Sequence, residues 1–152
     1  MGLEVKVHNG VVARWDSVHH GDHVTYASLE FEGGKRLAQF MVEQGLNDIL
    51  EPALKAGMPV KLHVVTPIHT LKSAVVAFSD SSGHLFATDL PPLPYQWVLK
   101  VILILSILLV PIFGVGFITF GMWVNLRMKI QPFLDLRKYL DALPGATMIK
   151  PS

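Results

Sequence analysis

The sequence contains no cysteine, and this absence excludes disulfide bonds and thiolate metal sites. The chain has only 152 residues, which leaves room for one small domain and little else. Its net charge of +1 hides an uneven distribution. Residues 1–95 hold seven basic and ten acidic residues, whereas residues 96–152 hold six basic and only two acidic ones. Because phosphate neutralisation supplies most nucleic-acid affinity, the acidic first part argues against a nucleic-acid partner.

A long uncharged run, VILILSILLVPIFGVGFITFGMWV, occupies residues 101–124. About 20 helical residues cross a bilayer core, so the run predicts a single transmembrane helix over residues 96–125. Aromatic rings and basic side chains favour the headgroup region. The expected interface anchors are Tyr95, Trp97, Trp123, Arg127 and Lys129.

The orientation of this segment has three interpretations. The excess of basic residues after the run places the C-terminus in the cytoplasm. That orientation would require export of the N-terminal domain, yet the start MGLEVK resembles neither a secretory signal nor a myristoylation site. We therefore favour a cytoplasmic N-terminal domain at a bacterial inner membrane. Pro111, Gly114 and Gly116 leave a third possibility, a re-entrant hairpin with both ends in the cytosol.

Short features surround and interrupt the apolar run. Gly114 and Gly121 fall on nearly one helix face, where small residues permit close helix packing. Residues 90–95 are proline-rich and predict a stiff spacer. Residues 126–152 predict an amphipathic helix and a tail, which would lie on a membrane or dock on a partner. Its apolar positions are Phe133, Leu136, Leu140 and Leu143.

Residues 1–89 alternate between apolar and polar side chains in several short segments, a pattern typical of half-buried strands. A helical pattern between the third and fourth strands, residues 46–54, indicates an α+β fold. The expected form is an OB-like barrel of five to six strands, or an open meander, with one short helix. A ligand face on the middle strands would offer the side chains of Tyr26, Phe31, Arg36 and Phe40. By alternation, His8 and His63 fall on the polar faces of their strands.

The segment VHHGDH, residues 18–23, gathers three imidazoles and one carboxylate. It resembles the HxHxDH motif of metallo-β-lactamase-fold hydrolases, which bind zinc to activate water. Val18 stands where the first histidine belongs, and the chain is too small for that fold. A simpler zinc site would join His20 and His23 to His63, His69 or His84. We favour an exposed loop without metal, in which His19, His20, Asp22 and His23 contact a partner or respond to pH.

These observations predict a non-enzymatic, membrane-anchored adaptor without a cofactor, whose β-rich domain binds a partner protein. Its expected partners are the lipid bilayer and a membrane protein complex or a second copy of the chain. One alternative is a membrane-bound metal-dependent enzyme or metal sensor that uses the histidines. Another is a regulatory or inhibitory subunit that acts through its transmembrane helix.

Overall fold

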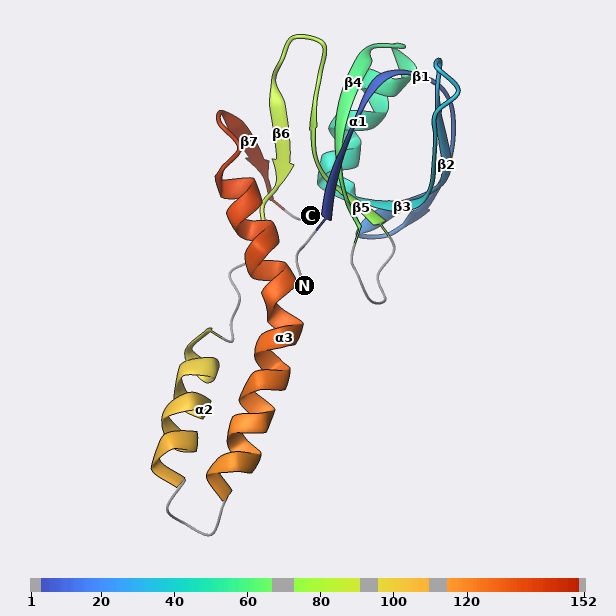
Figure 1. The fold of residues 1–152 in the computed structure, drawn as a ribbon. Helices are drawn as coiled ribbons and strands as arrows, with labels where there is room; N and C mark the ends of the chain where they lie inside the picture. Colours follow the sequence, from blue (N-terminus) through green and yellow to red (C-terminus); the bar gives the residue numbers. More distant parts are fainter. Residues whose placement is uncertain (1–3, 67–72, 91–95, 110–114, 151–152) are drawn as a thin grey trace. The chain divides into compact units, whose positions relative to one another are not determined.

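The computed structural model describes residues 4–66, 73–90, 96–109 and 115–150, shown in Figure 1. These residues form two compact units. The β-rich unit contains Met1–Leu90 and Arg137–Ser152, and the helical unit contains Pro91–Leu136. The strands are β1 (Glu4–His20), β2 (His23–Phe31), β3 (Arg36–Glu43), β4 (Pro59–Thr66), β5 (Ser73–Ser79), β6 (Leu85–Thr88) and β7 (Ala146–Ile149). The helices are α1 (Gln44–Lys55), α2 (Gln96–Leu109) and α3 (Val115–Asp141).

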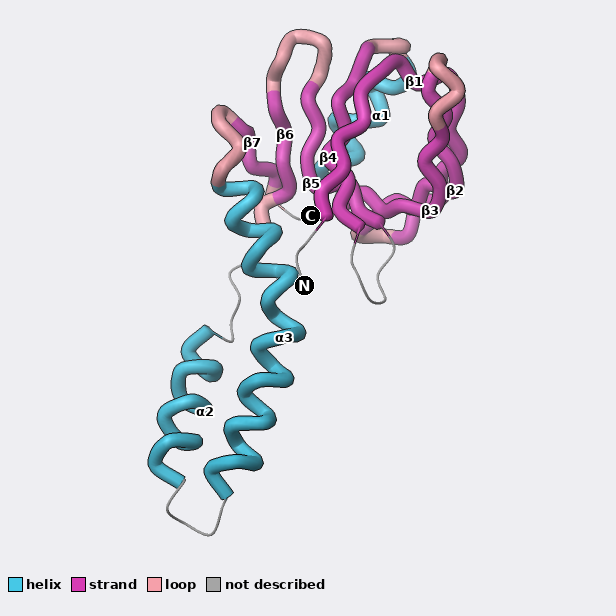
Figure 2. The backbone as a smooth tube through the Cα atoms, in the orientation of Figure 1, coloured by secondary structure: helices cyan, strands magenta, loops and turns pink. Residues whose placement is uncertain are grey.

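Five strands of the β-rich unit pair in a closed ring. β1 pairs with β2 and β4, β2 pairs with β3, and β4 pairs with β5, all antiparallel. A parallel pairing of β3 with β5 closes the ring, which is visible in Figure 2. Helix α1 connects β3 to β4. The ring is therefore a small barrel with one helix between its third and fourth strands.

Strand β1 takes part in two pairings because it is long and irregular. Its first part pairs with β4 through Val11, and its second part pairs with β2 from Val12 onward. A register shift between Val12 and Arg14 accompanies the change of partner. Gly10 lies just before it, where a Cβ atom would stand 3.0 Å from the Phe31 ring. The close approach of these two strands thus requires glycine.

The core fills the barrel with the inward side chains of the strands and one stripe of α1. Leu46, Leu50 and Leu54 recur every four residues along α1, and all three are buried. They pack with strand residues into one cluster that includes Val24, Tyr26, Leu29, Phe40, Val42, Leu62 and Phe78. Tyr26, Phe31 and Phe40 are thus core residues and do not form an open ligand face.

The sheet continues beyond the barrel on the side of β5. β6 pairs with β5 antiparallel, and β7 pairs with β6 in parallel, with Leu85 opposite Ala146. These two strands lie far apart in the sequence, and the whole helical unit intervenes between them. The helical unit is therefore an insertion whose two ends join the same β-rich unit.

The predicted transmembrane helix over residues 96–125 is wrong. Two helices, α2 and α3, occupy this part of the chain. Among the residues that the structure describes, no helix combines the length and apolar character needed to cross a membrane. The described residues form a seven-stranded mixed sheet and three helices, and the predicted single-pass membrane location is overturned with the helix.

The C-terminal region also differs from its prediction. Residues 126–141 continue α3 without interruption, and Pro132 lies inside this helix. The chain then enters β7, so the predicted amphipathic helix and tail end in a sheet. Leu140, at the end of α3, is almost completely buried. At this position, the apolar stripe predicted for residues 126–152 packs within the β-rich unit.

Candidate functional site

The histidine-rich loop joins β1 to β2 in a two-residue turn. His20 pairs with His23 across the end of the hairpin, and their ring centroids are 5.4 Å apart. Gly21 occupies the turn with a φ of 67°, a conformation that glycine adopts without strain. The Asp22 carbonyl accepts a hydrogen bond from the Gln44 backbone at 3.0 Å, which fixes the turn to the start of α1. Residues 19–22 are exposed, and the flanking strands and the contact with α1 hold the loop in place.

In this loop, the carboxylate of Asp22 and the imidazole of His23 form a hydrogen-bonded pair. Asp22 Oδ1 lies 2.7 Å from His23 Nδ1. This hydrogen bond lowers the pKa of the Asp22 carboxyl below its usual value. No group of three potential metal ligands exists among the residues that the structure describes, and His69 lies outside them. The zinc site considered as an alternative for these histidines is therefore not assembled in the part of the chain that is described.

An exposed apolar side chain accompanies the loop. Val18 pairs with Thr25, which in turn pairs with Met41 on β3. Residues opposite one another in paired strands share a face of the sheet. Val18 is 53% exposed although it lies in a regular strand. We define Val18 and residues 19–23 as the hairpin end, which combines one apolar group with three imidazoles.

The sequence alternation placed His8 and His63 on the polar faces of their strands. This prediction is wrong, because both side chains are buried. His63 Nδ1 lies 2.5 Å from the Tyr139 hydroxyl, so the end of α3 covers this part of β4. Burial lowers the pKa of His63, and the nearby Lys61 charge lowers it further. Burial also lowers the pKa of His8, with added effects from Lys35 and Lys6. Burial therefore disfavours the charged form of both imidazoles.

A polar network runs from the buried core of the barrel to the exposed part of α1. The Tyr26 hydroxyl donates to Asn47 Oδ1 at 2.6 Å, and Asn47 Nδ2 donates to Glu51 Oε2 at 3.3 Å. Glu51 forms an ion pair with Lys55 at 2.8 Å. Burial raises the pKa of Tyr26, and the Glu51 charge raises it further. The network satisfies the buried polar groups of α1, and its raised tyrosine pKa makes it a poor source of a nucleophile.

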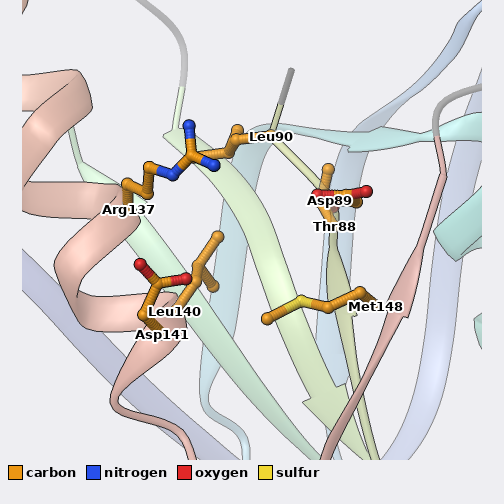
Figure 3. A pocket seen from close by; sticks show the side chains of 7 residues that line it. All are labelled: Thr88, Asp89, Leu90, Arg137, Leu140, Asp141 and Met148. Atoms are coloured by element: carbon orange, nitrogen blue, oxygen red, sulfur yellow. The ribbon is translucent and has the colours of Figure 1, made fainter. Parts of the chain in front are cut away.

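Two depressions lie on the surface of the described part of the β-rich unit. Figure 3 shows the smaller, which holds about 20 Å³, room for roughly one water molecule. It is lined by Thr88, Asp89, Leu90, Arg137, Leu140, Asp141 and Met148. The second depression is open and includes Lys61 and Asp80. Asp80 accepts hydrogen bonds from Ser82 and the His84 backbone, so its carboxylate stabilises its own turn.

The helical unit exposes ten of the large apolar side chains that the structure describes. Phe117 and Ile118 are adjacent in α3, and they are 72% and 68% exposed. The other large apolar side chains exposed in this unit are Val101, Ile104, Leu105, Ile107, Phe120, Met122, Met128 and Phe133. Monomeric soluble proteins rarely expose so many apolar groups together. This surface is the candidate binding element of the chain.

The predicted anchors and packing glycines have different outcomes. Trp123 stacks on Phe120 with ring centroids 5.7 Å apart, and the Arg127 guanidinium lies 5.3 Å from the Trp123 ring centroid. Lys129 is exposed in the same helix. A Cβ atom at Gly121 would meet nothing within 4 Å, so the structure gives no close packing there. Tyr95 and Gly114 lie outside the described residues, as does the side chain of Trp97.

Comparison with known proteins adds no relative. No family model matches the chain, and neither a curated protein nor a solved structure matches it. Any function has to be argued from the surfaces described above. The hairpin end was found by sequence reasoning, whereas the contact between His63 and Tyr139 was missed. No signal within either segment connects two residues 76 positions apart.

Proposed function

We propose that this chain is a non-enzymatic accessory protein that docks on a surface and holds a partner protein there. The helical unit docks through its exposed apolar side chains, and the β-rich unit holds a partner protein. The observation that carries this proposal is the exposure of ten large apolar side chains in the helical unit. Such surfaces normally mark a binding site. Attachment would confine both molecules to one place and raise their effective concentration, so a modest protein interface would suffice.

The hairpin end is the proposed contact for the partner protein. It is exposed, held by the barrel, and pairs apolar Val18 with polar groups, a mixture that is common at interface edges. Its position in a β-turn fixed to α1 reduces the ordering cost of binding.

Site-specific photo-cross-linking in cells tests this function. A photoreactive residue at Val18 should form one dominant product with another protein, whereas the same residue at Glu32, in the exposed β2–β3 turn, should form none. His20→Ala combined with His23→Ala should reduce the Val18 product severalfold. Equal labelling from Val18 and Glu32, or catalytic turnover by the purified chain, would overturn the proposal.

The sequence-based alternatives gain no support from a specific observation. The described residues hold no metal-ligand group for a metal-dependent enzyme or sensor. A regulatory subunit acting through a transmembrane helix falls with that helix. We therefore propose no second function.

A further inference from the structure

In the helical unit, apolar and charged residues occupy different stretches along each helix and not opposite faces of it. In α2, every residue after Lys100 is apolar except Ser106, whose hydroxyl donates to the Ile102 carbonyl at 2.7 Å. In α3, charged side chains begin only at Arg127. A helix that docks in a protein groove is usually apolar on one face and polar on the opposite one. Here the apolar residues 101–109 of α2 and 115–124 of α3 are separated from the charges by their position along each helix axis.

The two strands that flank the helical unit pair with each other, so both ends of that unit must lie on the same side of a membrane. β6 precedes the helical unit and β7 follows it, yet the two strands pair in parallel from Leu85–Ala146 to Thr88–Ile149. A single crossing would separate these strands by the thickness of a membrane. The chain must therefore return to the side from which it entered.

The lengths of the apolar parts match half of a bilayer. The apolar residues of α2 from Val101 to Leu109 would extend about 14 Å at 1.5 Å per residue. Those of α3 from Val115 to Val124 would extend about 15 Å. The hydrocarbon core is about 30 Å thick, so each part reaches about as deep as one leaflet.

The charged residues that flank the apolar parts of α2 and α3 are all basic. Between residues 90 and 134 the sequence contains Lys100, Arg127 and Lys129 and no aspartate or glutamate. All three are exposed, and we call them the basic collar. Trp123 lies beside Arg127, at the boundary between the apolar segment and the collar. Aromatic rings and basic side chains at such a boundary favour anionic headgroups.

We propose that the helical unit inserts into one leaflet of an anionic lipid surface as a hairpin that does not cross it. The basic collar then lies among the headgroups, and the β-rich unit stays on the side of entry. This inference rests on the proposed function, because it names what the exposed apolar surface binds. It differs from the overturned single-pass helix, since neither helix crosses.

Single-cysteine labelling of the full chain tests the insertion, because the natural sequence has no cysteine. An environment-sensitive dye at Ile118→Cys should shift to shorter wavelength when vesicles of phosphatidylglycerol and phosphatidylcholine are added. The same dye at Glu32→Cys is the control and should not shift. In closed vesicles, a membrane-impermeant maleimide added outside should react with both Glu32→Cys and Lys150→Cys. Protection of one and not the other would indicate a crossing and overturn the hairpin.

Flotation of the unlabelled chain with the same vesicles measures the affinity. Phe117→Gln combined with Ile118→Gln should weaken binding at least tenfold, whereas Val7→Gln combined with Met58→Gln, at exposed positions of the β-rich unit, should not. Arg127→Gln combined with Lys129→Gln should weaken binding to anionic vesicles severalfold and leave binding to neutral ones unchanged.

Three results would overturn the insertion and identify a different occupant. A dye shift at residue 118 that depends on protein concentration without lipid would indicate a second copy. Cross-linking of residue 118 to another protein, without flotation, would indicate a protein groove. Flotation unaffected by the Phe117 and Ile118 changes would indicate adsorption elsewhere. The Val18 cross-link is independent of these results, so its loss alone would refute the partner-protein part of the proposed function.

Discussion

The two units use apolar residues in opposite ways. In the β-rich unit, buried and exposed side chains alternate, as with buried Tyr26 and exposed Ala27 on β2. In the helical unit, exposed apolar side chains are neighbours, as with Phe117 and Ile118. The alternating arrangement lets a sheet bury its own apolar face. The β-rich unit therefore completes its core from its own residues, whereas the helical unit presents its apolar surface outward.

The largest expected contrast comes from the same substitution in each unit. Phe40 is 1% exposed and stacks on Tyr26, so Phe40→Ala should lower the free energy of unfolding by about 3–5 kcal/mol. Phe117→Ala should change it by less than about 0.5 kcal/mol, because that ring is mostly exposed. Urea unfolding of the full chain, followed by circular dichroism, measures both. Similar losses for the two variants would contradict the contrast between the units.

The buried polar network should give the next largest effect. Asn47→Ala leaves the Tyr26 hydroxyl without its partner inside the core, so we expect a loss of about 1–3 kcal/mol. Asp48→Ala is a matched control, since the neighbouring Asp48 pairs with Gln44 on the exposed side of α1. Its cost should stay below about 0.5 kcal/mol. Equal losses of unfolding free energy in the same urea experiment would mean that the buried Tyr26–Asn47 hydrogen bond stabilises the fold no more than the exposed Asp48 pair does.

The contact between Tyr139 and His63, which lies within the β-rich unit, should contribute less. Tyr139→Phe removes the hydroxyl next to His63 and keeps the ring, so the expected loss is about 0.5–1.5 kcal/mol. Lys138→Ala, at an exposed neighbouring position, should cost less than 0.5 kcal/mol. If the two variants unfold at the same urea concentration, the end of α3 does not depend on this contact.

The same contact predicts a pH dependence. Folding lowers the pKa of His63 below its ordinary value of 6.5, so the unfolded chain binds more protons between the two pKa values. Its contribution to stability is therefore complete above pH 6.5 and is lost as the pH falls toward the lower, folded pKa. His63→Gln should make stability less dependent on pH between 7 and 5. Because the pKa of His8 is lowered as well, His8→Gln measures its share, and unchanged pH profiles in both variants would refute the assignment.

Local patterns were sufficient to predict much of the β-rich unit. The alternation of apolar and polar side chains predicted several half-buried strands in residues 1–89, and β2 shows such a mixture of buried and exposed side chains. The repeat of leucines predicted a helix over residues 46–54, and α1 covers Gln44–Lys55. These features depend on neighbouring residues, whose periodicity the sequence displays directly.

Features that depend on distant segments were missed. The parallel pairing of β6 with β7 and the burial of His63 under Tyr139 both require the chain after the helical unit to return. Hydropathy alone also could not distinguish one long helix over residues 96–125 from two shorter ones, because both contain the same uncharged residues. At the candidate site, the sequence identified the exposed histidine loop, whereas the exposure of the apolar helices became clear only from the fold.

The smallest expected effect concerns Gly121, which the sequence assigned to helix packing. A Cβ atom there would meet nothing within 4 Å, so Gly121→Ala has space. Alanine favours a helix interior over glycine by roughly 0.5–1 kcal/mol, and the variant should therefore be slightly more helical by circular dichroism. Gly121→Leu distinguishes the two interpretations further, because leucine would disrupt a close helix contact but would only enlarge an exposed apolar surface. Vesicle binding that is kept or strengthened in Gly121→Leu would support the open surface, whereas lost binding would restore a packing role.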